Sequence, residues 1–204
     1  MDKSERISKV IFIFTIISIS FAFFIFSCFD LSFNAIQCLF MLLCLFIPYF
    51  IQSIFKVKVS SLMFIIFDIY LIAHFVFGEI LGFYIKILHY DTFLHFSSAI
   101  LLSMFGYSII HYYLKDKYYI IQLLFAIMFG LSCEFFWEIL EFLIDEFFLT
   151  NMQRFIKDGI LLIGHEAIKD TIKDMIVAVF GSVSFLLLIR NKKFKDIKIS
   201  KYVN

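Results

Sequence analysis

CEFFWEILEFLID, residues 133–145, places four carboxylates in one of the most apolar stretches of the chain. Glu134, Glu138, Glu141 and Asp145 lie at offsets of 0, 4, 7 and 11 residues. At about 100° per residue, these offsets put all four side chains within about 60° of arc on one helix face. A carboxylate inside a lipid bilayer needs a cation, a hydrogen-bond donor or a proton, because unpaired charge is costly there. The stretch therefore predicts a membrane helix with an acidic face that is a candidate functional site.

The composition of the whole chain is that of a membrane protein. Hydrophobic residues make up 62% of the 204 residues, and the mean hydropathy is +0.95, whereas soluble domains contain roughly 45–50% apolar residues. Six spans of roughly 20 residues would use most of the chain, so we expect one membrane domain, residues 1–204. The net charge is +1, and the basic residues stand at the ends of apolar segments, which argues against nucleic acid as a partner.

Apolar runs bounded by charged or turn residues predict an all-α, multi-pass bundle in the lipid bilayer. The runs are continuous and lack the period-two alternation of membrane strands. The six predicted transmembrane helices cover residues 10–29, 32–55, 61–83, 92–113, 119–142 and 171–189, and a loop covers residues 149–169.

The distribution of Lys and Arg predicts the orientation of this bundle. With six spans, 13 of the 18 basic residues fall on the side of the two termini, and five fall on the other side. The positive-inside rule then places the N- and C-termini in the cytoplasm of a bacterial cell, with the protein in the plasma (inner) membrane. The acidic end of the fifth span and the loop would face the outer leaflet, where Ile160 to Ile163 could dip into the interface as a lid or a re-entrant turn.

Further polar residues are expected at the same level of the membrane. Asp91 and His95 are four residues apart, as are Asp170 and Asp174, so each pair projects from one helix face and could offer two ligands to one cation. One imidazole with several carboxylates suits a hard or borderline divalent ion such as Mg²⁺, Mn²⁺, Ca²⁺ or Zn²⁺. The candidate metal ligands are Asp91, His95, Glu134, Glu138, Glu141, Asp170 and Asp174, with Glu79, Asp145, Trp137 and Gln153 as further site residues.

Two other interpretations of these residues remain open. Without a metal ion, facing carboxylates cannot all stay ionised, and the same groups could relay protons in a proton- or cation-coupled transporter. Asp68 and His74 in the third span could extend such a polar path. Alternatively, Glu141, Asp145, Asp170 and Asp174 form ion pairs with Lys169, Lys173 or Arg154 that only hold helices together in a structural or accessory membrane protein.

Several motifs, taken together, resemble those of a known family. The chain contains Asp91-Thr-Phe-Leu-His95-Phe96, Glu134-x-x-Trp137-Glu138-x-x-Glu141, Asn151-Met152-Gln153 and Asp170-Thr-x-x-Asp174-Met175, followed by Gly181. In their order and spacing they resemble the YjdF-like family of uncharacterised bacterial inner-membrane proteins. The start of the first motif, and Asp174 followed by Gly181, are also similar to VanZ-like proteins of the cell envelope, although Ala178 stands where these tend to have Asn.

The sequence thus leads to one principal functional hypothesis. Asp91, His95, Glu134 and Glu138 are the candidate catalytic residues, and with Asp174 they would hold a divalent metal ion that polarises a phosphate or activates a water molecule. The substrate would be an envelope lipid or a lipid-linked headgroup.

Overall fold

A computed structural model of the chain describes residues 3–29, 32–115, 117–189 and 200–201. Six of its helices are long and apolar enough to cross a membrane, which confirms the predicted all-α, multi-pass fold. The six helical spans are Lys3–Cys28, Asn34–Phe55, Ser61–Ile80, Tyr90–Leu114, Tyr119–Phe148 and Lys169–Ile189. The tail residues Arg190, Lys192, Lys193, Lys195 and Lys198, which contribute to the predicted orientation, lie outside the described residues.

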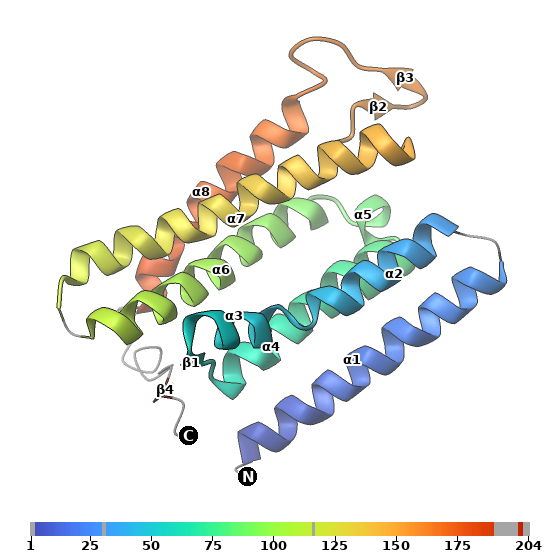
Figure 1. The fold of residues 1–204 in the computed structure, drawn as a ribbon. Coiled ribbons are helices and arrows are strands. Elements are labelled where there is room, and N and C mark those ends of the chain that lie inside the picture. Colours follow the sequence, from blue (N-terminus) through green and yellow to red (C-terminus); the bar gives the residue numbers. More distant parts are fainter. Residues whose placement is uncertain (1–2, 30–31, 116, 190–199, 202–204) are drawn as a thin grey trace. The chain divides into compact units, whose positions relative to one another are not determined.

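The chain divides into two units, the first formed mainly by residues 1–90 with 111–115 and 192–204, and the second by residues 91–110 with 116–191. A single membrane domain remains a prediction. The first unit contains α1 (Lys3–Cys28), α2 (Ser32–Cys44), α3 (Ile47–Phe55), α4 (Ser61–Leu71), η1 (Ile72–Ile80) and α5 (Phe83–Lys86), with β1 (Val57–Lys58) paired to β4 (Ser200–Lys201). Within it, α1 packs against α2 and α4 (Figure 1).

Two spans of the first unit are less regular than the sequence predicts. The second span breaks at Leu45 and Phe46 into α2 and α3, and Pro48 stands in the first turn of α3, where a missing N–H costs nothing. The third span continues from α4 into the π-helix η1 and ends at Ile80, three residues before the predicted end. Gly82 follows with φ +71°, a left-handed conformation that glycine adopts easily and that ends the helix here.

The second unit consists of three long helices and one loop. Its helices are α6 (Tyr90–Leu114, of which residues 91–110 belong to this unit), α7 (Tyr119–Phe148) and α8 (Lys169–Ile189). The helix α7 runs six residues beyond the predicted end at Phe142, so the whole acidic face lies inside one helix. The loop between α7 and α8 contains the short antiparallel strands β2 (Ile156–Lys157) and β3 (Ile160–Leu161) (Figure 1).

Candidate functional site

Glycines let the three helices of the second unit approach closely. A Cβ atom on Gly106 of α6 would lie 2.7 Å from Cβ of Phe129 of α7. A Cβ atom on Gly130 of α7 would meet the hydroxyl oxygens of Ser103 and Ser182, and one on Gly181 of α8 would meet the backbone carbonyl of Phe96. Close contact through small residues is a usual way for membrane helices to pack. It brings the polar faces of α6, α7 and α8 together.

His95 of α6 lies at the centre of the polar cluster and is buried. Its Nδ1 is 3.0 Å from Oε2 of Glu134 on α7, and its Nε2 is 3.7 Å from Oδ1 of Asp91. Because an ionised carboxylate can only accept, Nδ1 carries the hydrogen in the contact with Glu134. The hydroxyl of Ser98 donates to Oε1 of the same carboxylate at 2.5 Å. In the neutral imidazole, Nε2 is then free to bind a cation or accept a proton.

Three side chains from two helices offer ligand atoms to a common point. One ligand atom each of Asp91, His95 and Asp174 lies within 4.8 Å of the other two. Metal–ligand distances in proteins run from about 2.0 to 2.6 Å, so two ligands of one ion are at most about 5 Å apart. The arrangement therefore fits one divalent ion held between α6 and α8, with Glu134 orienting the imidazole as carboxylates do behind metal-binding histidines.

Two carboxylates of the cluster retain oxygens without hydrogen-bond partners. Glu138 of α7 is 5% exposed, and neither of its oxygens makes a hydrogen bond within the described residues. One of them lies 3.9 Å from Nδ1 of His95. Oδ1 of Asp174, a residue that is 3% exposed, also makes no hydrogen bond within the described part of the chain. Because a buried carboxylate oxygen without a hydrogen bond is costly, these oxygens could accept a bound ion or a proton.

Two half-exposed basic side chains flank this acidic cluster. Arg154 of the loop places Nη2 3.3 Å from Asp91 and Nε 3.6 Å from Asp170. Lys173 of α8 places Nζ 3.8 Å from Asp170 and 3.6 Å from Asp174. The ion pairs that the alternative interpretation expects for Asp170 and Asp174 are thus present. Those of Arg154 join the loop to α6 and α8, and those of Lys173 lie within α8.

The loop that carries Arg154 is held by side-chain hydrogen bonds. Asp145 accepts from Oγ1 of Thr150 at 2.5 Å, from the backbone N–H of Met152 at 2.7 Å and from that of Gln153 at 2.9 Å. The side-chain amide of Gln153 donates to Oγ1 of Thr171 on α8 at 3.0 Å. Asp145 and Gln153 therefore fix the loop, and the structure gives neither residue a contact with His95.

The remaining predicted site residues divide between the two units. Glu141 is buried, and its Oε1 accepts from Nε1 of Trp137 at 2.8 Å, so these two residues stabilise each other on α7. Glu79 lies in η1 of the first unit. The cluster is therefore formed by residues of the second unit, which are Asp91, His95, Glu134, Glu138, Asp170 and Asp174.

The structure adds three residues to the predicted site, which are Arg154, Lys173 and Ser98. Lys173 stands three residues after Asp170 and one before Asp174, a spacing that indicates an ion pair on the helix surface. Ser98 follows His95 by three residues and shares its helix face. Nothing in the sequence indicates that Arg154 contacts Asp91, because 62 positions and two helices separate them.

Comparison with known proteins gives one match. Residues 10–193 match the model of a family described as "Predicted membrane protein (DUF2238)". No curated protein and no solved structure matches the chain.

Proposed function

The chain belongs to the DUF2238 family of predicted membrane proteins, and from the geometry of its acidic cluster we propose that it binds a divalent metal ion in the membrane. The ion would be held by Asp91, His95 and Asp174. The convergence of their three ligand atoms within 4.8 Å carries this proposal. The unbonded oxygens of Glu138 next to His95 support it independently, because a buried carboxylate of this kind calls for a cation or a proton.

The chemistry that fits the site is metal-dependent reaction of an envelope lipid or a lipid-linked headgroup. Oxygen and imidazole ligands suit Mg²⁺, Mn²⁺, Ca²⁺ or Zn²⁺, and such an ion would polarise a phosphate oxygen or activate a water molecule. Glu138, whose carboxylate lies 3.9 Å from Nδ1 of His95, would be the general base that takes a proton from that water. The apolar helices around the site agree with a substrate that comes from the bilayer. The YjdF-like and VanZ-like resemblances, and a location in the bacterial inner membrane with cytoplasmic termini, are part of this proposal.

A second candidate function is proton- or cation-coupled transport. Asp68 favours it, because this residue of α4 is 1% exposed and neither of its oxygens makes a hydrogen bond within the described residues. A carboxylate in this state inside a membrane helix binds a proton or a cation. Proton-dependent flux in vesicles that requires Asp68 would favour transport over headgroup chemistry.

The metal test uses purified protein stripped with a chelator and titrated with each divalent ion. We expect roughly one tightly bound ion per chain, since one cluster supplies the ligands. Asp174→Asn removes a ligand charge and should weaken binding at least about ten-fold, as much as the loss of an outer-shell partner does. Asp158→Asn, on the exposed turn between β2 and β3, removes a carboxylate of the same charge away from α8 and should bind like the wild type. A wild-type protein that binds no divalent ion would refute the proposal.

A further inference from the structure

Arg154 and Lys173, the two basic side chains beside the acidic cluster, have N–H donors that their carboxylate contacts leave unused. Among the described residues, Nη1 of Arg154 takes part in no hydrogen bond or ion pair, and Nε and Nη2 contact carboxylates at 3.6 and 3.3 Å. Lys173 contacts its two carboxylates at 3.8 and 3.6 Å, longer than a hydrogen bond. The side chains are 41% and 37% exposed, so a ligand can reach both.

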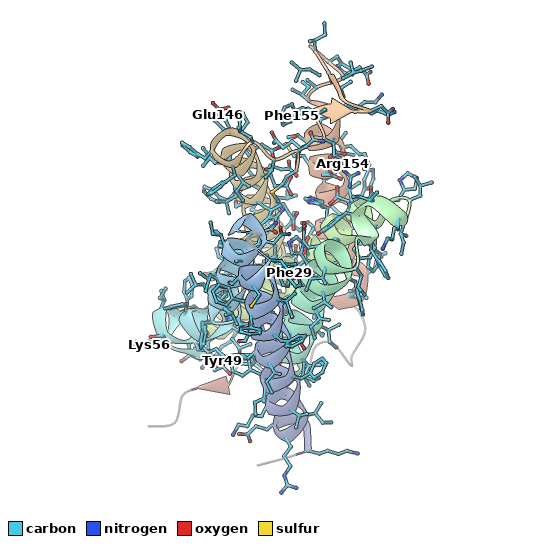
Figure 2. All side chains as sticks on the ribbon, turned by 90° about the vertical axis from the view of Figure 1, so that its right-hand side faces the viewer. Phe29, Tyr49, Lys56, Glu146, Arg154 and Phe155 are labelled. Carbon is cyan, nitrogen blue, oxygen red and sulfur yellow. The ribbon has the colours of Figure 1, made fainter. Side chains whose placement is uncertain are left out.

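The structure holds Arg154 in a conformation that an arginine rarely adopts. Its φ is +52°, in the left-handed region, which is unfavourable for a non-glycine residue. Its N–H donates to the carbonyl of Asn151 at 3.2 Å, and the side chain of Asn151 bonds both the N–H and the carbonyl of Ile156 at 2.8 Å. These bonds fix Arg154 at the base of the loop (Figure 2). Strain of this kind is common where a side chain must be aimed at a ligand.

Metal binding would reduce the negative charge around these two residues. Asp91, Asp170 and Asp174 face Arg154 and Lys173, and Glu134 and Glu138 lie beside His95 in the same cluster, so carboxylates outnumber the basic groups. A divalent ion bound to Asp91 and Asp174 would add two positive charges to this cluster and draw both carboxylates away from their basic partners. The freed guanidinium and ammonium groups would then lie on the exposed side of the ion, where they favour an anion.

We propose that Arg154 and Lys173 bind a phosphate group of the substrate over the metal ion. This inference rests on the proposed function and deepens it by naming the substrate class. A guanidinium offers a planar fork that matches two phosphate oxygens, and the lysine supplies a point charge for a third. The group is a phosphate ester of a lipid headgroup or a soluble phosphate, which share this chemistry.

The test titrates inorganic phosphate into protein held in a phosphate-free maltoside detergent. The protein is loaded with the divalent ion that it retains or is stripped with a chelator. We expect phosphate to bind the loaded wild type and not the stripped protein. Arg154→Gln should weaken phosphate binding about ten-fold or more, because it removes charge-assisted bonds. The same change should leave metal affinity equal or higher, because it removes a competing positive charge.

Controls separate this role from a purely structural one. Lys157→Gln removes a positive charge from the same loop and should bind phosphate as the wild type does. Arg154→Lys keeps the charge without the fork and should bind with intermediate affinity. Lys173→Gln tests the same site should Arg154→Gln fail to fold. Phosphate binding unchanged in both glutamine variants, or a joint loss of metal affinity and thermal stability in them, would show that the basic residues only stabilise the loop and α8.

The source of the phosphate is assigned by competition. Phosphatidic acid in the detergent micelles should displace inorganic phosphate if the natural group is lipid-borne, and diacylglycerol, which has the same acyl chains without phosphate, should not. Displacement by neither lipid indicates a soluble phosphate compound. Loaded wild-type protein that binds the metal ion but no phosphate overturns this inference alone, whereas a failure to bind metal overturns the proposed function with it.

Discussion

His95 lies between carboxylates that contact different edges of its ring. Glu134 accepts from Nδ1 at 3.0 Å, and Asp91 lies 3.7 Å from Nε2. Two glutamates of the α7 face differ in their contacts. Glu134 accepts hydrogen bonds from His95 and Ser98, whereas the oxygens of Glu138 make none within the described residues. In the proposed metal site, Glu134 would orient the imidazole, and Glu138 would remain available to the ion or its water molecule.

At the residue scale, Glu134→Gln tests this division of roles. The amide keeps the shape and can still accept from Nδ1, but it loses the charge that makes the imidazole a stronger ligand. We expect metal affinity to fall about 10- to 100-fold, the usual effect of changing a group behind a ligand, with folding and insertion largely retained. Isothermal titration of the purified variant measures the change. Ser132→Ala, on the exposed side of the same helix, is the control, and unchanged metal affinity in Glu134→Gln would contradict the orienting role.

Three helices, α6, α7 and α8, position the site. Gly130 of α7 faces the hydroxyls of Ser103 and Ser182, and Gly181 of α8 faces the backbone of Phe96, one residue after His95. Close backbone approach at these glycines sets the distance between the helices that carry Asp91, His95 and Asp174. A side chain at either glycine would therefore act on the geometry of the ligands and on stability together.

At the element scale, Gly181→Ala compares two opposing effects. Alanine favours the helix by about 1 kcal/mol over glycine, whereas overpacking a tight contact costs about 1–3 kcal/mol. The contacted atom is a backbone carbonyl that cannot rotate away, so we expect the second effect to exceed the first. Thermal unfolding in detergent should show a lower Tm, together with weaker metal binding. Val183→Ala on the exposed face of α8 is the control, and a Tm equal to or above the wild type in Gly181→Ala would show that the helices can separate at no cost.

For the molecule as a whole, orientation in the membrane decides which compartment the site faces. The loop with Arg154 and Lys157 connects α7 to α8 at the acidic end of α7, and the Lys and Arg asymmetry predicts that this end faces outward. An outward site would act on lipids or ligands of the outer leaflet. An inward site would act on cytoplasmic ones, so the same chemistry would serve a different substrate pool.

At the scale of the whole molecule, cysteine labelling in intact cells tests this orientation. A cysteine at Lys157, an exposed residue of β2, should react with a membrane-impermeant thiol reagent. One at Lys195 should react only after the cells are opened, because 13 of the 18 basic residues are predicted to stay in the cytoplasm. The parent protein without added cysteines reports the background from its four natural ones. The reverse labelling pattern would place the site in the cytoplasmic leaflet.

The sequence by itself determined the membrane fold, the six spans and the common face of the α7 carboxylates. These features depend on local hydropathy and on a period of 3.6 residues, which a linear pattern contains in full. The predicted face is confirmed, because Glu134, Glu138, Glu141 and Asp145 are all buried. The break at Leu45 and the π-helix at Ile72–Ile80 were not predicted, since continuous apolar runs do not show where a backbone changes its hydrogen-bond pattern.

Only the tertiary structure decided what each polar residue contacts. Glu134 and Asp145 stand on the same helix face, yet one bonds His95 and the other bonds the backbone of a loop. Periodicity gives the direction of a side chain around its own helix, but its partner depends on the distance and register between helices, which the glycine contacts and the loop set. Arg154 shows this most clearly. Its left-handed backbone and the hydrogen bonds of Asn151 place it beside Asp91, and Asn151 and Arg154 both lie in a loop that has no periodic pattern.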